Sequence, residues 1–81
     1  MNESTITPDR VLDCSGMTCP RPVIEASKSI KEIEVGQVLK VISTDPGSPM
    51  DMEAWSEQSG HSLIDSKQEN GNFVFYFIRL S

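Results

Sequence analysis

The chain has 81 residues, a formal net charge of −5 at pH 7 and a hydrophobic fraction of 37%. A chain of this length supports one small core and no deep internal cavity, so we expect its chemistry at the surface or against a partner. Its acidic balance, with a pI of about 4.6, argues against direct nucleic-acid binding, which relies on Lys and Arg at phosphates.

The sequence also bears on compartment, cofactors and metals. No apolar run is long enough to span a bilayer, and the N-terminus lacks the basic and apolar regions of a signal peptide. We therefore expect a cytoplasmic protein with no membrane insertion. Two cysteines in such a chain favour redox or transfer chemistry over a structural disulfide. Two cysteines and one histidine are too few for a structural zinc site, so we expect neither a metal nor a cofactor.

The first half of the chain predicts a strand, a helix and a second strand. Residues 11–13 form a short β-prone stretch that ends at Cys14 and Gly16. A helix is expected to begin at Pro20, since proline fits the first turn, where N–H groups have no intrahelical acceptor. Apolar residues then recur at helical spacing on one face: Val23, Ala26, Ile30 and Ile33. The β-branched residues of 38–43 predict a central strand.

A second helix is predicted after the central strand. Ser48 is expected to cap its N-terminus, with Pro49 at the first helical position and Asp51 in the place of a capping-box acid. The helix should run to about Gln58, because Gly60 is a natural C-terminal residue.

The end of the chain predicts a β-hairpin. Asn70–Gly71 is a strong hairpin signal between the β-prone residues 61–66 and 73–78. The resulting order, β-α-β-α-β-β, predicts an α/β (α+β) two-layer sandwich with a mixed four-stranded sheet and two helices on one face. We expect residues 1–9 to be a flexible N-terminal segment and 10–81 to be a single domain. The opposite sheet face should carry a weakly covered apolar patch.

The stretch Cys19–Pro20–Arg21–Pro22 is the strongest candidate for a functional site. Cys19 is expected at the N-cap of the helix or next to it, where the helix dipole and free N–H groups favour a thiolate. Arg21 adds a positive charge, and the two prolines stiffen the turn that presents the sulfur. We therefore predict a lowered pKa and a reactive thiol at Cys19.

The motif and its surroundings together resemble a known family. The residues that carry the resemblance are Leu12, Asp13, Gly16, Cys19–Pro20–Arg21–Pro22, Lys28, Gly36, Leu39, Thr44–Asp45–Pro46, Asp51, Trp55 and Gly60–His61. Their order and spacing, over roughly residues 10 to 79, resemble the TusA/SirA family of small sulfur carriers. The resemblance implies the same two-layer sandwich and a carrier that accepts sulfane sulfur as a persulfide on Cys19 and passes it to a partner thiol. Pro20, Arg21 and Pro22 would support that cysteine.

The resemblance further implies protein partners. A cysteine desulfurase, a rhodanese or a sulfur-compound transporter would supply the sulfur, and an acceptor protein would take it. Such a sulfurtransferase-type carrier works only with these partners, and whether it counts as an enzyme stays open. The family serves tRNA thiolation, molybdenum cofactor synthesis, thiosulfate use and sulfur oxidation, and the sequence does not select among these pathways.

Cys14 departs from the family pattern, since members of the tRNA pathway carry a small residue other than cysteine there. It is either a core residue at a strand end or a second functional thiol. A functional thiol could form a disulfide with Cys19 or accept sulfur. Two alternative functions therefore stay open beside the carrier. One is a non-catalytic interaction or regulatory module, and the other is a thiol redox switch that uses both cysteines.

Overall fold

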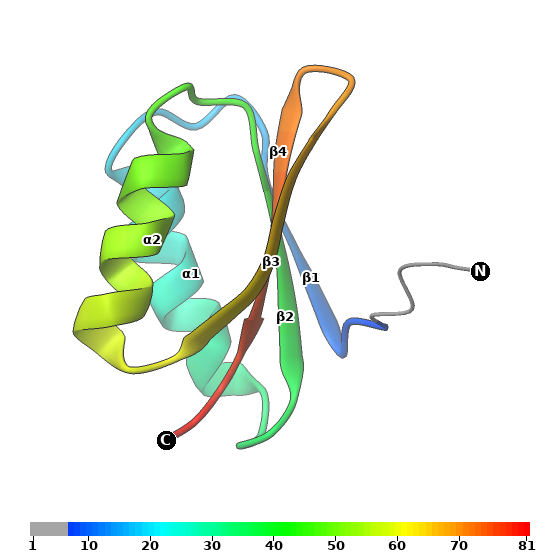
Figure 1. The fold of residues 1–81 in the computed structure, drawn as a ribbon, viewed down its shortest axis with the longest axis vertical. Coiled ribbons are helices and arrows are strands. Elements are labelled where there is room, and N and C mark those ends of the chain that lie inside the picture. Colours follow the sequence, from blue (N-terminus) through cyan, green and yellow to red (C-terminus); the bar gives the residue numbers. More distant parts are fainter. Residues whose placement is uncertain (1–6) are drawn as a thin grey trace.

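Four strands and two helices follow the predicted order in the computed structural model, which describes residues 7–81 (Figure 1). The elements are β1 (Arg10–Cys14), α1 (Arg21–Ser29), the 3₁₀ turn η1 (Ile30–Glu32), β2 (Val38–Ser43), α2 (Ser48–Ser59), β3 (Ser62–Glu69) and β4 (Asn72–Ile78). The predicted fold class is confirmed. Both helices cover one face of the sheet, on the left in Figure 1.

Most of the expected flexible segment, 1–9, lies outside the described residues. Asp9 lies inside them and is tied to the sheet. Its backbone N–H donates to the carbonyl oxygen of Val38 at 2.8 Å, and its carboxylate accepts the Val38 N–H at 2.8 Å. These two bonds continue the pairing of β1 with β2 by one residue.

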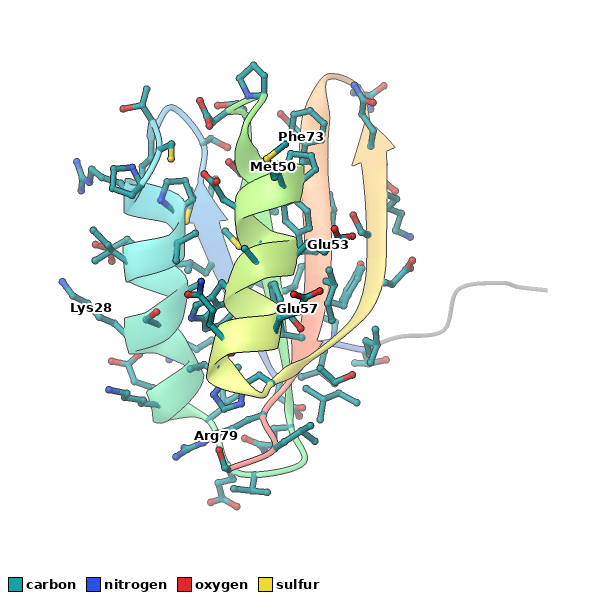
Figure 2. The ribbon with its side chains drawn as sticks, turned by 60° about the vertical axis from the view of Figure 1, so that its left-hand side comes forward. Lys28, Met50, Glu53, Glu57, Phe73 and Arg79 are labelled. Atoms are coloured by element: carbon teal, nitrogen blue, oxygen red, sulfur yellow. The ribbon has the colours of Figure 1, made fainter. Side chains whose placement is uncertain are left out.

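The sheet is mixed, with the strand order β1-β2-β4-β3. β1 and β2 are parallel, whereas β4 runs antiparallel to both of its neighbours, β2 and β3. A helix follows each of the two parallel strands, so α1 and α2 begin at the same edge of the sheet, the upper end in Figure 2. This topology brings two β-to-α junctions side by side, and the candidate site lies between them.

The core fills the space between the helices and the sheet. Trp55 on α2 packs edge-on against Phe77 of β4, with ring centroids 4.8 Å apart. The α1 side contributes three of the four residues predicted for the buried face, and the fourth, Val23, is partly buried against them. The core residues are Cys14, Ala26, Ile30, Ile33, Leu39, Val41, Met52, Trp55, Phe75 and Phe77. Burial of each large apolar side chain contributes about 1.5–3 kcal/mol.

The opposite sheet face is better covered than the sequence predicted. Val74 and Tyr76 are buried although they do not belong to the core under the helices. The Nζ atoms of Lys40 and Lys67 lie 5.8 and 5.6 Å from the centre of the Tyr76 ring. Long lysine side chains cover apolar surface with their methylene groups while the charge stays in water. Val11, at 55% exposure, is the open part of this face.

Two helix starts differ from the prediction. α1 begins at Arg21, one residue later than expected, and Pro20 is its N-cap residue. α2 has Gly47 and not Ser48 as its N-cap, and no side-chain cap hydrogen bond forms there, so the predicted capping box is wrong. The reason is tertiary: the Ser48 hydroxyl is buried and bonds to Ser43 instead. The end of α2 is as predicted, since Gly60 follows the helix with a left-handed φ of 84°.

The longer helix, α2, has 12 residues. Within residues 7–81, no helix combines the length and apolar character that crossing a bilayer requires.

Candidate functional site

Cys19 lies in the junction between β1 and α1, next to the N-cap residue, and its side chain is exposed. The turn around it is fixed by the Arg21 N–H, which donates to the carbonyl oxygen of Thr18 at 2.9 Å, and by the Pro20 carbonyl, which accepts the Ile24 N–H at 3.2 Å. Pro22 is buried in the first turn and anchors it. The four motif residues thus present the sulfur at the surface on a turn held from both sides.

The start of α1 offers less stabilisation of a thiolate at Cys19 than the sequence predicted. The Arg21 N–H is already bonded to Thr18, so it is not available to an anionic sulfur. The Arg21 side chain is exposed, and its charge opposes, without reversing, the rise in the pKa of Cys14 that burial causes.

The prediction of a lowered pKa at Cys19 is wrong. The Asp51 carboxylate lies within hydrogen-bonding reach of the thiol, and this pairing is the main reason why the pKa of Cys19 is raised. Partial desolvation and the negative charges of Asp51 and Asp45 act in the same direction. All of these favour the neutral thiol over the thiolate. The neighbouring Asp51 carboxylate is thus the main influence that raises the pKa of this sulfur.

Asp51 comes from the first turns of α2, in the neighbouring β-to-α junction. Sequence reasoning gave it a capping role and missed its contact with the thiol. A signal was available: two parallel strands that are each followed by a helix place the two helix starts at one sheet edge, where sites of α/β proteins commonly form. Asp45, in contrast, is the predicted turn former, and its carboxylate accepts the Gly47 N–H at 3.1 Å.

A shallow groove of about 210 Å³ runs between α1 and α2 from the thiol. Its lining is Cys19, Pro20, Val23, Asp51, Ala54, Trp55 and Gln58. Only the thiol, Asp51 and Gln58 give it polar side chains, apart from the indole N–H of Trp55. Met50, the residue before Asp51 on α2, is 78% exposed at the same end of the helix (Figure 2). The exposed sulfur therefore lies at one end of an apolar surface.

Cys14 lies apart from this surface. It is fully buried at the end of β1 and belongs to the core. Burial is the main cause of its raised pKa, and the negative charges of Glu25 and Asp13 add to it. Both cysteines are free thiols, so one faces the core and the other faces solvent.

His61 lies at the opposite end of the helix pair, outside the thiol site. It is 9% exposed, and its Nδ1 accepts the Leu80 N–H at 3.1 Å. Burial, together with the charge of Arg79, lowers its pKa. His61 also lines a second cavity of about 280 Å³ with Trp55 and Lys31. Among residues 7–81, no three acidic, cysteine or histidine side chains gather closely enough to hold a metal ion.

Comparisons with known proteins agree with this fold. Residues 10–79 match the model of the family Sulfurtransferase TusA. The chain is 48% identical over 67 residues to the Sulfur carrier protein TusA of Allochromatium vinosum, which covers 83% of this chain and 88% of that protein. A longer Aquifex aeolicus protein is 47% identical over 73 residues, and this chain, of which 90% is matched, spans 37% of its length.

A solved structure is similar as well. The SirA-like protein from Desulfitobacterium hafniense superposes with a TM-score of 0.76 at 26% identity, over 89% of this chain and 99% of that one. Since the family model matches nearly all of the described residues, the chain belongs to the TusA family.

Proposed function

We propose that this protein is a sulfur carrier in a sulfur relay. Cys19 takes a sulfane sulfur from a donor protein, holds it as a persulfide and hands it to a thiol of an acceptor protein. The observation that carries the proposal is the contrast between the two thiols. Cys19 is exposed beside an apolar groove, whereas Cys14 is buried in the core.

The chemistry requires an accessible sulfur. In loading, the sulfur of Cys19 attacks the terminal sulfur of a donor persulfide, and the donor thiolate leaves. In delivery, a thiol of the acceptor attacks the terminal sulfur on Cys19, and Cys19 is the leaving group. Access and the protonation of Cys19 therefore influence both rates. The relay needs no cofactor in this chain, because the sulfur arrives already at the oxidation level at which it leaves.

The partners are proteins rather than free small molecules. A groove of about 210 Å³ that is open to solvent is too shallow to enclose a substrate, but it suits a side chain or loop that brings a second cysteine to Cys19. Met50, the residue before Asp51 on α2, adds exposed apolar surface at the same end of the helix. A cysteine desulfurase, a rhodanese or the cytoplasmic part of a sulfur-compound transporter is the proposed donor, and another protein thiol is the acceptor. We place this exchange in the cytoplasm, where free thiols stay reduced.

The motif residues have separate roles in this proposal. Buried Pro22 and the N-cap residue Pro20 hold the turn that presents the sulfur. Arg21 is exposed next to the thiol and offers a cation to an acidic rim of the partner.

The proposal is tested by mass spectrometry after incubation with a purified cysteine desulfurase and cysteine. The wild-type protein should gain about 32 Da on Cys19 as a persulfide. The variant Cys19→Ser should gain nothing, whereas Cys14→Ala should load like the wild type once its folding has been verified. Full loading of Cys19→Ser would contradict the assignment.

The same variants separate the alternative functions in cells. Cys19→Ser should fail to restore the phenotype of a deletion strain if the protein carries sulfur. Full restoration would instead support a non-catalytic interaction or regulatory module.

A further inference from the structure

The carboxylate of Asp51 is placed where it can exchange a proton with the thiol of Cys19. Both side chains line the same groove, one from each β-to-α junction, within hydrogen-bonding reach of each other. Within residues 7–81, the Asp51 carboxylate takes part in none of the ion pairs and serves no helix cap. Asp45, the other nearby acid, is occupied by the Gly47 N–H. Asp51 is thus the acid at this site that is not committed to holding the backbone.

We infer that Asp51 passes on the proton in both transfers: from the Cys19 thiol to the donor sulfur when sulfur is loaded, and from the acceptor thiol to Cys19 when sulfur is delivered. This inference rests on the proposed carrier function and adds a residue to it. Asp51 lines the same groove as the reacting sulfur, so the role assigned to it is in the transfer step itself. The neutral thiol that the site favours is a poor nucleophile until it loses its proton, and a half-exposed carboxylate is a ready acceptor.

The loading step balances without an oxidant or reductant. The Cys19 thiol gives its proton to Asp51 while its sulfur forms a bond to the terminal sulfur of the donor persulfide. The donor's sulfur–sulfur bond breaks, and the donor sulfur leaves with the electron pair and takes the proton from Asp51. A donor persulfide and a thiol thus become a donor thiol and the persulfide of Cys19.

Delivery runs the same step in the opposite direction. The acceptor thiol gives its proton to Asp51 and its sulfur bonds to the terminal sulfur on Cys19. The sulfur of Cys19 then leaves with the electron pair and takes up the proton from Asp51. The carboxylate returns to its starting state after each transfer.

If Asp51 only repelled the thiolate, replacing its carboxylate would make sulfur loading faster rather than slower. Removing its charge would lower the pKa of Cys19 and raise the thiolate fraction. As the pKa falls, the thiolate fraction rises more steeply than the nucleophilicity of the thiolate decreases. Loading at neutral pH would therefore become about threefold faster for each unit by which the pKa is lowered. The two charged groups that act on the thiol are Asp51 and Asp45, and Asp45 stays in place in this comparison.

The decisive variant is Asp51→Asn, tested with glutathione persulfide as the sulfur donor. The rate at which the protein gains one sulfur is followed by mass spectrometry at several pH values. In parallel, the rate of alkylation by iodoacetamide reports the thiolate fraction of Cys19. We expect alkylation at pH 7 to become faster while sulfur loading becomes about 10²-fold slower, the lower end for a positioned acid–base group. Asp51→Glu keeps a carboxylate and should load faster than Asp51→Asn.

Glu53→Gln is the matched control. It removes one negative charge from the same helix, at a residue whose side chain points away from α1 (Figure 2). It should load like the wild type, and urea unfolding should show that all variants are folded. Loading by Asp51→Asn that equals or exceeds the wild-type rate would overturn this inference alone. Loading by Cys19→Ser would instead overturn the proposed function.

Discussion

The hydroxyl oxygens of Ser43 and Ser48 lie 2.5 Å apart, and both side chains are buried. Ser43 is the last residue of β2 and Ser48 is the first residue of α2. This hydrogen bond therefore closes the β2-to-α2 junction from inside and fixes where α2 begins on the sheet. Because Asp51 follows in the first turns of α2, the pair also sets the place of its carboxylate beside Cys19.

The serine pair should stabilise the fold measurably. Ser43→Ala or Ser48→Ala leaves one buried hydroxyl without its partner, which costs about 1–3 kcal/mol. The double variant removes both hydroxyls, so its cost should be smaller than the sum of the two. Urea unfolding measures all three, and exposed Ser66 offers Ser66→Ala as a control, with an effect within about 0.5 kcal/mol. Strictly additive costs would show that the two hydroxyls do not support each other.

The two cysteines should differ sharply in reactivity. A thiol reagent should modify one cysteine quickly in the folded protein, because Cys19 is exposed and Cys14 is fully buried. Both should react in urea. Peptide mapping by mass spectrometry identifies the modified residue. Rapid modification of both thiols in the folded protein, or an intramolecular disulfide after mild oxidation, would instead favour the redox switch.

The pH dependence of stability should carry a contribution from His61, the single histidine of the chain. Burial and Arg79 lower its pKa, and protonation of Nδ1 would break its hydrogen bond with the Leu80 N–H. The folded state thus binds the proton less tightly than the unfolded chain, whose histidine pKa is about 6.5. The stability from this group is present above about pH 6.5 and is lost as the pH falls through the folded pKa.

An NMR titration of the imidazole signals checks this directly. The measured pKa should lie below about 6.5, and the difference in urea midpoint between pH 7 and pH 5 should shrink in His61→Gln. A histidine that titrates at or above its ordinary value would contradict the effect of burial.

Filling the groove should slow sulfur transfer from protein donors much more than transfer from small-molecule donors. Ala54 is exposed on α2 and lines the groove. Ala54→Gln fills part of it without a change in charge, so transfer from a cysteine desulfurase should slow by about tenfold, the loss expected for about 1.4 kcal/mol of binding. Loading from glutathione persulfide should change far less. Exposed Glu57, on the outward side of α2 (Figure 2), offers Glu57→Gln as a control.

Equal loss with both donors would show that the substitution disturbs the thiol itself. Unchanged transfer from the desulfurase would place the docking surface elsewhere on the molecule.

The elements could be predicted from the sequence because their signals are local. Helical spacing identified the buried face of α1, and Asn70–Gly71, with positive φ values of 51° and 82°, formed the predicted turn. The site could be predicted only in part. The turn that exposes Cys19 follows from its own four residues, but its pKa depends on Asp51, which comes near only through the parallel pairing of β1 with β2. Ser48 failed as a cap for the same reason, since its partner is on the sheet.

The division of the site between two β-to-α junctions has a consequence for how the four-residue motif is interpreted. Cys19 belongs to one junction, and the group that governs its acidity belongs to the other. Selection can therefore adjust the reactivity of the sulfur by changes around Asp51 while Cys19–Pro20–Arg21–Pro22 stays untouched. Two proteins with an identical motif need not handle sulfur at the same rate, and a comparison of carriers should include the residues that begin the second helix.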